Sequence, residues 1–275
     1  MTEAKPIRAA VCGAMGRMGQ SVVRAALRRP GFSVVGVVER PGHPLLGQNI
    51  GPLAGAAELD LTLTSSLAEA AVEADLYIDF TTPEASLAYL REAAELKIGA
   101  VIGATGFDEA QKEKLRAAGR AMPVLWAPNM SIGVNVMYKI AGAMAAMLGP
   151  DYDIEIVEAH HNQKKDAPSG TALKLQETLA ATRGLKPEET LVTGRAGQCG
   201  VRGRDEIAVL AIRGGDIIGD HTVYFAGPGE RLELTHRAGA RDTFAQGALR
   251  AAAWLAGRAP GLYSLDDVMI PAAPA

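Results

Sequence analysis

The sequence is poor in cysteine, in net charge and in long apolar runs. Its two cysteines, Cys12 and Cys199, are too few for a disulfide framework, which excludes the small disulfide-stapled folds. The formal net charge of −3 gives no general attraction to nucleic acid or to an anionic membrane, so we expect neither as a partner. We find no apolar run of transmembrane length and no secretory core after Met1, which predicts a cytoplasmic protein.

Length and composition indicate an α/β protein of enzyme size. At 275 residues and 48% hydrophobic residues, the chain can bury a large core and is long enough for two domains. Its 31 glycines suit an architecture rich in tight turns. Cys199 as a catalytic nucleophile stays an alternative, although the sequence locates no neighbouring base that would activate its thiol.

A glycine-rich turn near the N-terminus has the form of a phosphate-binding loop. Residues 7–12 have the pattern of a buried strand, residues 21–29 that of a helix, and three glycines lie between them. In a dinucleotide-binding fold, such glycines let the backbone approach the pyrophosphate at the helix N-terminus. The spacing is G-x-x-G-x-x-G instead of the commoner G-x-G-x-x-G. The residues of this turn are Gly13, Ala14, Met15, Gly16, Arg17, Met18 and Gly19.

An acidic and a basic residue follow the next predicted strand, residues 32–38. Glu39 can accept hydrogen bonds from the ribose hydroxyls of NAD. Arg40 can pair with the 2′-phosphate of NADP. Both NADH and NADPH are therefore candidate cofactors, and an ordinary surface pair of Glu and Arg is the alternative.

The alternation of strands and helices continues with predicted strands at residues 76–80, 99–102 and 123–126. An open parallel sheet binds its ligand at the carboxyl ends of its strands. Glycine and asparagine are common in the loops of most proteins, so a purely structural role for these loop residues is the alternative. We expect four loop residues to surround a nicotinamide, namely Gly103, Thr105, Asn129 and Ser131.

Two histidines and two lysines lie between a predicted strand and a predicted helix. Residues 153–157 alternate polar and apolar side chains, as a half-buried strand does, so His160 and His161 would follow its end. Histidine exchanges protons near neutral pH, and Lys164 lies within four residues of both rings. The segment therefore predicts proton transfer, with a solvated basic turn as the alternative.

The helix after the histidines would begin at a site suited to anions. Ser169 is a good N-cap for the helical pattern of residues 172–180. Backbone N–H groups at a helix N-terminus attract a carboxylate or a phosphate, and the Ser169 and Thr171 hydroxyls can add donors. Gly170 has no side chain to block a ligand that approaches the backbone. An acidic substrate fits this segment better than a neutral one.

The pattern changes after the long helical run of residues 132–148. Consecutive strand patterns at residues 206–212, 221–225 and 231–236 have no helix between them, which predicts a mainly antiparallel or mixed sheet in an α+β domain. The predicted fold class is α/β, with a Rossmann-type dinucleotide-binding domain formed by residues 1–131 and 242–275. Residues 132–241 would form a domain for substrate binding and oligomerisation.

Several of these segments together resemble one enzyme family, the 4-hydroxy-tetrahydrodipicolinate reductases, also called dihydrodipicolinate reductases. The resemblance covers nearly the whole chain, and residues 158–172 are its most specific part. It implies reduction of a cyclic dicarboxylate by NADH or NADPH in diaminopimelate and lysine biosynthesis, by a homotetramer. The other matching segments are residues 13–19, 103–107, 129–135, 213–216 and 219–222.

The resemblance also implies roles for single residues. His160 matches the proton donor or acceptor of the family and Lys164 its proton donor. Ala104 replaces a threonine that is usual in the family, and Thr82 stands where some members have arginine, so the choice between the cofactors stays open. Substrate contacts are implied for Thr105, His161, Ser169, Gly170 and Thr171. Cofactor contacts are implied for residues 13–19, Glu39, Gly103, Ala104, Thr105, Ala127, Pro128, Asn129 and Met130, with Arg40 added from the strand-end pattern.

No metal is expected. A protonated lysine offers no lone pair, and no cluster of Cys or carboxylates completes a ligand set around the two histidines. Two other functions stay open. One is a different two-domain dehydrogenase acting on a small amino acid or a semialdehyde, and the other is a nicotinamide-sensing protein without turnover.

Overall fold

The computed structural model describes residues 5–52, 59–240 and 242–269. The chain forms two compact units, Met1–Ile132 with Arg241–Ala275, and Gly133–Ala240. The first of these is called unit 1 and the second unit 2.

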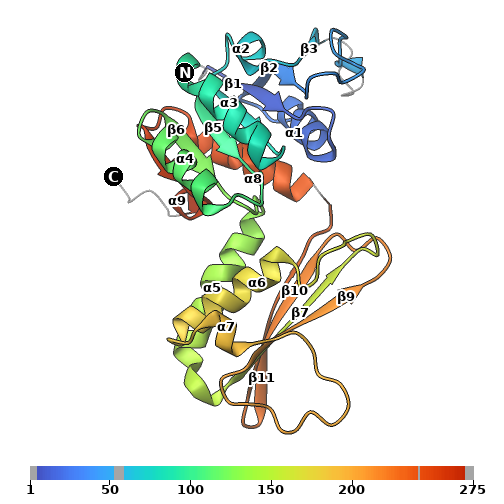
Figure 1. Ribbon diagram of the computed structural model, residues 1–275, viewed down its shortest axis with the longest axis vertical. Coiled ribbons are helices and arrows are strands. Elements are labelled where there is room, and N and C mark those ends of the chain that lie inside the picture. Colours follow the sequence, from blue (N-terminus) through green and yellow to red (C-terminus); the bar gives the residue numbers. More distant parts are fainter. Residues whose placement is uncertain (1–4, 53–58, 241, 270–275) are drawn as a thin grey trace. The chain divides into compact units, whose positions relative to one another are not determined.

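Unit 1 contains a sheet of seven parallel strands in the order β12-β6-β5-β4-β1-β2-β3 (Figure 1). The predicted bounds of β1, β2, β5 and β6 are confirmed, and their apolar sequences reflect burial on both faces of the sheet. The strands are β1 (Ile7–Cys12), β2 (Phe32–Val38), β3 (Leu63–Thr64), β4 (Leu76–Asp79), β5 (Gly99–Ile102), β6 (Pro123–Trp126) and β12 (Gly261–Tyr263).

Helices cover both faces of this sheet, and each face has its own apolar core. Val22 of α1 and Leu249 of α8 pack on one face, whereas Leu90 of α3 and Leu115 of α4 pack on the other. The helices are α1 (Arg17–Leu27), α2 (Leu67–Ala70), α3 (Pro83–Leu96), α4 (Glu109–Gly119), α8 (Asp242–Leu255) and α9 (Leu265–Met269). The prediction of a Rossmann-type α/β fold is confirmed.

The strand order predicts a ligand-binding position at the carboxyl end of β1. The chain runs from β1 to β2 on one side and returns to β4 on the other side. Such a switch point opens a crevice at the carboxyl ends of the two strands that diverge. The loops beginning at Gly13 and at Phe80 leave these ends, which puts the glycine turn where a dinucleotide binds.

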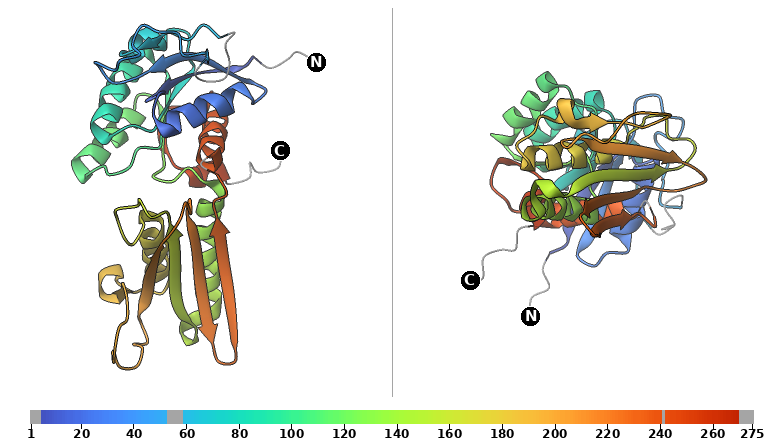
Figure 2. Two further views of the ribbon diagram at one scale, coloured as in Figure 1. Left: turned by 90° about the vertical axis from the view of Figure 1, so that its right-hand side faces the viewer. Right: turned by 90° about the horizontal axis from the view of Figure 1, so that it is seen from below.

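Unit 2 contains a five-stranded sheet in the order β11-β10-β7-β9-β8. The pairs β10–β11 and β7–β10 are antiparallel, whereas β7–β9 and β8–β9 are parallel, so the sheet is mixed. Helices α5 and α6 pack on the same face of the sheet (Figure 1 and Figure 2). The elements are α5 (Ile132–Leu148), β7 (Asp153–His160), α6 (Gly170–Thr182), α7 (Pro187–Thr190), β8 (Leu191–Val192), β9 (Ile207–Arg213), β10 (Asp220–Gly227) and β11 (Glu230–Arg237), with a 3-10 turn at Gly149–Asp151.

Two expectations for this half of the chain need correction. Strand β7 does not end before the histidines but continues through His160, because its backbone stays paired with Arg213 of β9. Residues 184–203 form a loop-like stretch for which the sequence also allows a short strand, and they carry α7 and the short strand β8. Near the end of this stretch, Arg202 pairs with Asp153 and Glu155. Ile132–Asp151 is long and apolar enough to cross a membrane by these two criteria alone, contrary to the expected absence of such a run. A single helix of this kind is weak support for a membrane span, because core helices of soluble proteins meet the same criteria.

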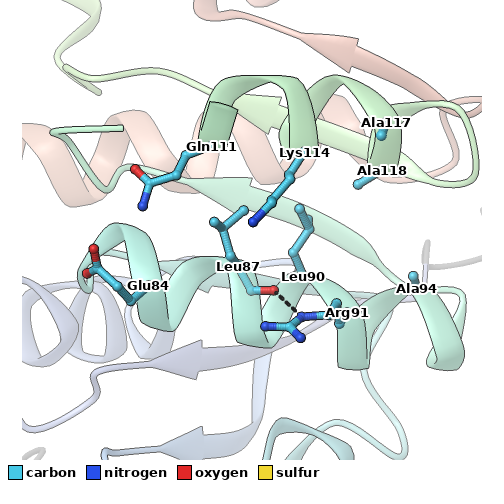
Figure 3. A pocket seen from close by; sticks show the side chains of 9 residues that line it. All are labelled: Glu84, Leu87, Leu90, Arg91, Ala94, Gln111, Lys114, Ala117 and Ala118. Carbon is cyan, nitrogen blue, oxygen red and sulfur yellow. Dashed lines mark hydrogen bonds between the residues drawn. The ribbon is translucent and has the colours of Figure 1, made fainter. Parts of the chain in front are cut away.

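A groove of about 600 Å³ lies between α3 and α4 on the outer side of unit 1 (Figure 3). Leu87 and Leu90 form its floor, and Lys114 points between the two helices. The lining residues include none of those predicted to contact cofactor or substrate.

Candidate functional site

The glycine turn after β1 is closely packed against its surroundings. Gly13 has a positive φ of 68°, which favours glycine, and a Cβ placed there would lie 2.7 Å from Cγ2 of Thr81. A Cβ at Gly19, in the first turn of α1, would lie 2.0 Å from the carbonyl oxygen of Gly13. The two glycines therefore bring the start of α1 against the turn, which is the arrangement that a pyrophosphate requires.

Glu39 lies next to this turn. Its Oε2 accepts a hydrogen bond from the backbone N–H of Met15 at 3.2 Å, and its Oε1 accepts one from the N–H of Arg40 at 3.0 Å. The carboxylate thus sits between the end of β2 and the glycine turn, where ribose hydroxyls would approach. The Arg40 side chain is exposed at the same strand end.

The predicted cofactor residues divide into two groups by burial. Some are buried residues, of which only backbone groups can meet a ligand: Ala14, Gly19, Ala104, Ala127 and Met130. The others are half-buried or exposed: Gly13, Met15, Gly16, Arg17, Met18, Glu39, Arg40, Gly103, Thr105, Pro128 and Asn129. At Ala104 the side chain points into the core while its carbonyl oxygen accepts from Nε1 of Trp126 at 3.1 Å.

Asp79 is a residue of this unit that the sequence patterns did not single out. It is fully buried at the end of β4, and its carboxylate accepts hydrogen bonds from the Thr81 N–H at 2.8 Å and from the Thr81 and Ser86 hydroxyls. Burial raises the pKa of Asp79, although these donors oppose the effect. The carboxylate fixes Thr81, the residue against which Gly13 packs.

A buried carboxylate organises the polar residues of unit 2. Glu158 is 0% exposed, and its Oε2 lies 2.6 Å from Nδ1 of His160. Two N–H groups of Arg213 donate to the two carboxylate oxygens at 2.8 Å each. The backbone N–H of Ser169 adds a further bond to Oε1 at 3.0 Å. Glu158 therefore joins β7, β9 and the start of α6.

These contacts set the charges of the cluster. Burial alone would raise the pKa of Glu158, but the hydrogen bonds from Arg213, His160 and Ser169 together hold it below its usual value. Burial lowers the pKa of His160, and the Glu158 carboxylate opposes this effect. Glu158 is thus ionised, and His160 is a largely neutral base at physiological pH.

Lys164 and His161 lie in the loop after β7. The Nζ of Lys164 forms an ion pair with Asp166 at 3.0 Å, and its charge acts on His160, whose pKa it lowers. The backbone N–H of Lys164 donates to the carbonyl of His161 at 3.1 Å, which closes a turn over residues 161–164. The His161 side chain is half-buried.

The predicted helix N-terminus is confirmed at α6. The Ser169 side chain caps the helix by accepting a hydrogen bond from the N–H of Ala172 at 3.2 Å. Gly170 is exposed, and a Cβ placed there would meet nothing within 4 Å. The side chain of Thr171 is hydrogen-bonded to Tyr138 of α5, whose pKa burial raises to about 12. The first turn of α6 thus offers donors beside open space.

His221 completes the cluster from β10. It is 3% exposed, its Nε2 lies 3.1 Å from the Ser169 hydroxyl, and its ring meets that of His160 edge to face at 5.3 Å. Burial and the neighbouring His160 lower the pKa of His221 to about 3, so its ring is neutral. Among the residues that the structure describes, its Nδ1 has no hydrogen-bond partner.

The sequence contained a signal for the residues that were missed. In β7 the buried row runs from Ile154 through Ile156 to Glu158, a charged residue at a position where the alternation predicts an apolar one. His221 interrupts the buried row of β10 in the same way. A polar side chain among the buried positions of a strand costs free energy unless it is hydrogen-bonded. A polar residue at such a position therefore indicates a buried hydrogen-bond network.

Within residues 5–52, 59–240 and 242–269, no three His, Cys, Asp or Glu side chains form a group that could hold a metal ion.

Comparison with known proteins identifies the family. Residues 7–130 match the family model for the N-terminus of dihydrodipicolinate reductase, and residues 133–269 match the model for its C-terminus. The chain is 47% identical over 263 residues to the 4-hydroxy-tetrahydrodipicolinate reductase of Geotalea daltonii, covering 96% of this chain and 98% of the relative. It is 48% identical over 260 residues to the same enzyme of Geobacter sulfurreducens, covering 94% and 97% of the two chains.

A solved structure agrees with this result. The dipicolinate-bound dihydrodipicolinate reductase from Paenisporosarcina sp. TG-14 is 26% identical to the chain, with a TM-score of 0.76, and the match covers 96% of this chain and 100% of that one. An amine dehydrogenase from Mycobacterium smegmatis, 16% identical with a TM-score of 0.59 over 97% of each chain, shares the fold. The chain therefore belongs to the dihydrodipicolinate reductase family.

Proposed function

We propose that the protein reduces 4-hydroxy-tetrahydrodipicolinate to tetrahydrodipicolinate with NADH or NADPH, in diaminopimelate and lysine biosynthesis. Relatives with 47% and 48% identity over almost their whole length support this reaction. The observation that carries the proposal is the cluster in unit 2, where His160 is tied through Glu158 to the capped N-terminus of α6. A proton-exchanging ring and donors for a carboxylate are thereby part of one cluster.

The residues of this chain would hold the substrate and supply a proton. A bound nicotinamide would supply the hydride. In the first turn of α6, Gly170 and Thr171 would bind a substrate carboxylate through N–H and hydroxyl donors. Lys164 would donate a proton from Nζ, while His160 would exchange protons through Nε2 because Glu158 occupies Nδ1.

The dinucleotide would be held by unit 1. The glycine turn, residues 13–19, would contact the pyrophosphate. Glu39 or Arg40 would contact the ribose. The loops of residues 103–105 and 127–130 would contact the nicotinamide end. Support comes from the tight packing of Gly13 and Gly19 and from the place of Glu39 beside Met15.

A coupled assay tests the reaction. The preceding synthase generates the substrate in situ from pyruvate and aspartate semialdehyde, and oxidation of NADH or NADPH is followed by absorbance. We expect oxidation that depends on the synthase. Turnover with an amino acid or a free semialdehyde instead would assign another dehydrogenase activity, and cofactor binding without any turnover would favour a sensing role.

Pyridine-2,6-dicarboxylate should inhibit in competition with the substrate, because it presents two carboxylates on a planar ring. Thr171→Val removes the hydroxyl donor and keeps the shape, so the inhibition constant should rise about tenfold, as for a lost hydrogen bond to a charged group. Thr178→Val, the same change farther along α6, is the matched control. Inhibition that competes with the cofactor and ignores Thr171→Val would place the carboxylate site elsewhere.

Glu39 and Arg40 should act in opposite directions on cofactor choice. Glu39 should favour NADH, since its carboxylate repels a 2′-phosphate, and Arg40 should favour NADPH, so the native protein should use both. Arg40→Ala should lower kcat/KM for NADPH by around tenfold or more, from about 1.5–3 kcal/mol for a charge-assisted hydrogen bond, and leave NADH nearly unchanged. Arg28→Ala is the control, because Arg28 is an exposed arginine at the C-terminal end of α1. An equal loss with both cofactors would show that Arg40 does not contact the phosphate.

We also propose that the protein is a cytoplasmic homotetramer, as its family resemblance implies. The molar mass in solution, measured by light scattering, tests the oligomeric state.

A further inference from the structure

We propose that Glu158 and Arg213 are positioning residues for His160. The pair holds the imidazole in one orientation and one tautomer, with the hydrogen on Nδ1 and with Nε2 left to exchange protons. This inference deepens the proposed reductase function and rests on it for the identity of the reaction.

The tautomer follows from the contacts of Glu158. An ionised carboxylate only accepts hydrogen bonds, so the 2.6 Å contact between its Oε2 and Nδ1 of His160 requires the hydrogen on Nδ1. Glu158 is 0% exposed and cannot turn toward water. Both of its oxygens are also held by Arg213, and one of them by the N–H of Ser169. The ring orientation is therefore set by a carboxylate that is itself fixed.

The other ring nitrogen is kept accessible by a glycine. A Cβ placed on Gly219 would lie 3.1 Å from Nε2 of His160. A glycine at this position leaves that space unfilled, and Nε2 is the nitrogen that the Glu158 contact leaves without its hydrogen in the neutral ring.

Arg213 is needed to keep Glu158 charged. Burial alone would raise the pKa of Glu158, and the two parallel N–H bonds from Arg213 are the largest influence that opposes it. The guanidinium is itself anchored by a bond to the carbonyl of Asp166 at 2.7 Å. Lysine cannot reproduce this two-point contact, because its ammonium acts as a single charge.

The groups that face His160 act on it in different directions. Glu158 of its own strand raises the pKa of His160, whereas Lys164 of the following loop and Arg213 of β9 lower it. His221 of β10 is neutral because its own pKa is about 3. Among these four groups, only Glu158 stabilises the protonated ring, so its loss should make His160 harder to protonate.

The test compares Glu158→Gln with Glu155→Gln. Both residues belong to β7 and both pair with arginine, but Glu155 binds Arg195 and Arg202 instead of the histidine cluster. In protein with ¹⁵N- and ¹³C-labelled histidine, Glu158→Gln should lower the pKa of His160 by about one unit or more, as expected when a nearby opposite charge is removed. It should also lower kcat roughly 10- to 100-fold, as is found at metal sites when the hydrogen-bond partner of a ligating histidine is removed. The dissociation constant of NADH should not change. Glu155→Gln should change neither the histidine pKa nor kcat.

A double variant separates positioning from simple charge compensation. Glu158→Gln with Arg213→Met removes both charges, so thermal stability should recover relative to Glu158→Gln alone. We expect kcat to stay low, because His160 still lacks its carboxylate. Recovery of kcat together with stability would overturn the proposal, as would an unchanged His160 pKa in Glu158→Gln.

The native protein provides a measurement that does not depend on folding of the variants. The ¹⁵N shifts of neutral His160 should show the hydrogen on Nδ1 and titration at Nε2, and a neutral ring with its hydrogen on Nε2 would overturn the proposal. These shifts need no turnover. Failure of the coupled assay would therefore overturn the reductase function while leaving the assignment of the Glu158, Arg213 and His160 contacts to be judged separately.

Discussion

Lys164→Ala should lower kcat by roughly 10²–10⁴-fold, the usual range for the loss of general acid catalysis. The reduced ring gains electron density that must be protonated, and the Lys164 ammonium is the charged donor in the loop after β7. Its side chain is only 21% exposed and is held by Asp166 at 3.0 Å, so its position is defined before substrate binds. The dissociation constant of NADH, measured by fluorescence titration, should hardly change, because the predicted cofactor residues belong to unit 1.

Lys165→Ala is the matched control for this experiment. Lys165 is the neighbouring lysine and is exposed, so its loss removes the same charge from the same loop. We expect it to change kcat by less than a few-fold, since exposed charges contribute little. Near-native turnover of Lys164→Ala would exclude this lysine as the proton donor.

Gly19→Ala should weaken cofactor binding strongly, because the new methyl group would lie 2.0 Å from the Gly13 carbonyl oxygen and 2.7 Å from Cα of Ala14. Both atoms belong to the backbone, so either α1 or the glycine turn has to move. Overpacking of this kind costs about 1–3 kcal/mol or more of stability. A displaced turn can no longer follow the pyrophosphate, so the dissociation constant of NADH should rise about tenfold or more.

Gly194→Ala is the control for the cost of adding a methyl group at a glycine. A Cβ at Gly194 would meet nothing within 4 Å, so its stability and NADH binding should stay near native. Calorimetry and fluorescence titration measure the two quantities for each variant. Native NADH affinity in Gly19→Ala would mean that the close approach of α1 to the turn is not needed for binding.

Local patterns predicted much of the fold. The apolar runs of β1, β2, β5 and β6 are bounded by glycine, proline or charged residues, which is why their ends could be assigned from the sequence. The predicted cap Ser169 begins α6, because a hydroxyl near the helix start can accept a hydrogen bond from a free N–H group. The short strands β3 and β12 were missed, because two or three residues carry too little periodicity to be recognised.

The sequence by itself determined the chemistry available to this protein: a glycine turn after a buried strand, and two histidines with Lys164 before a capped helix. The tertiary structure alone decided how that chemistry is organised. Pairing of β7 with β10 sets Glu158 opposite His221, and pairing of β7 with β9 sets His160 opposite Arg213. These residues are more than fifty positions apart along the chain, so no local pattern relates them. Their meeting depends on strand register, which is fixed by burying the apolar rows of three strands together.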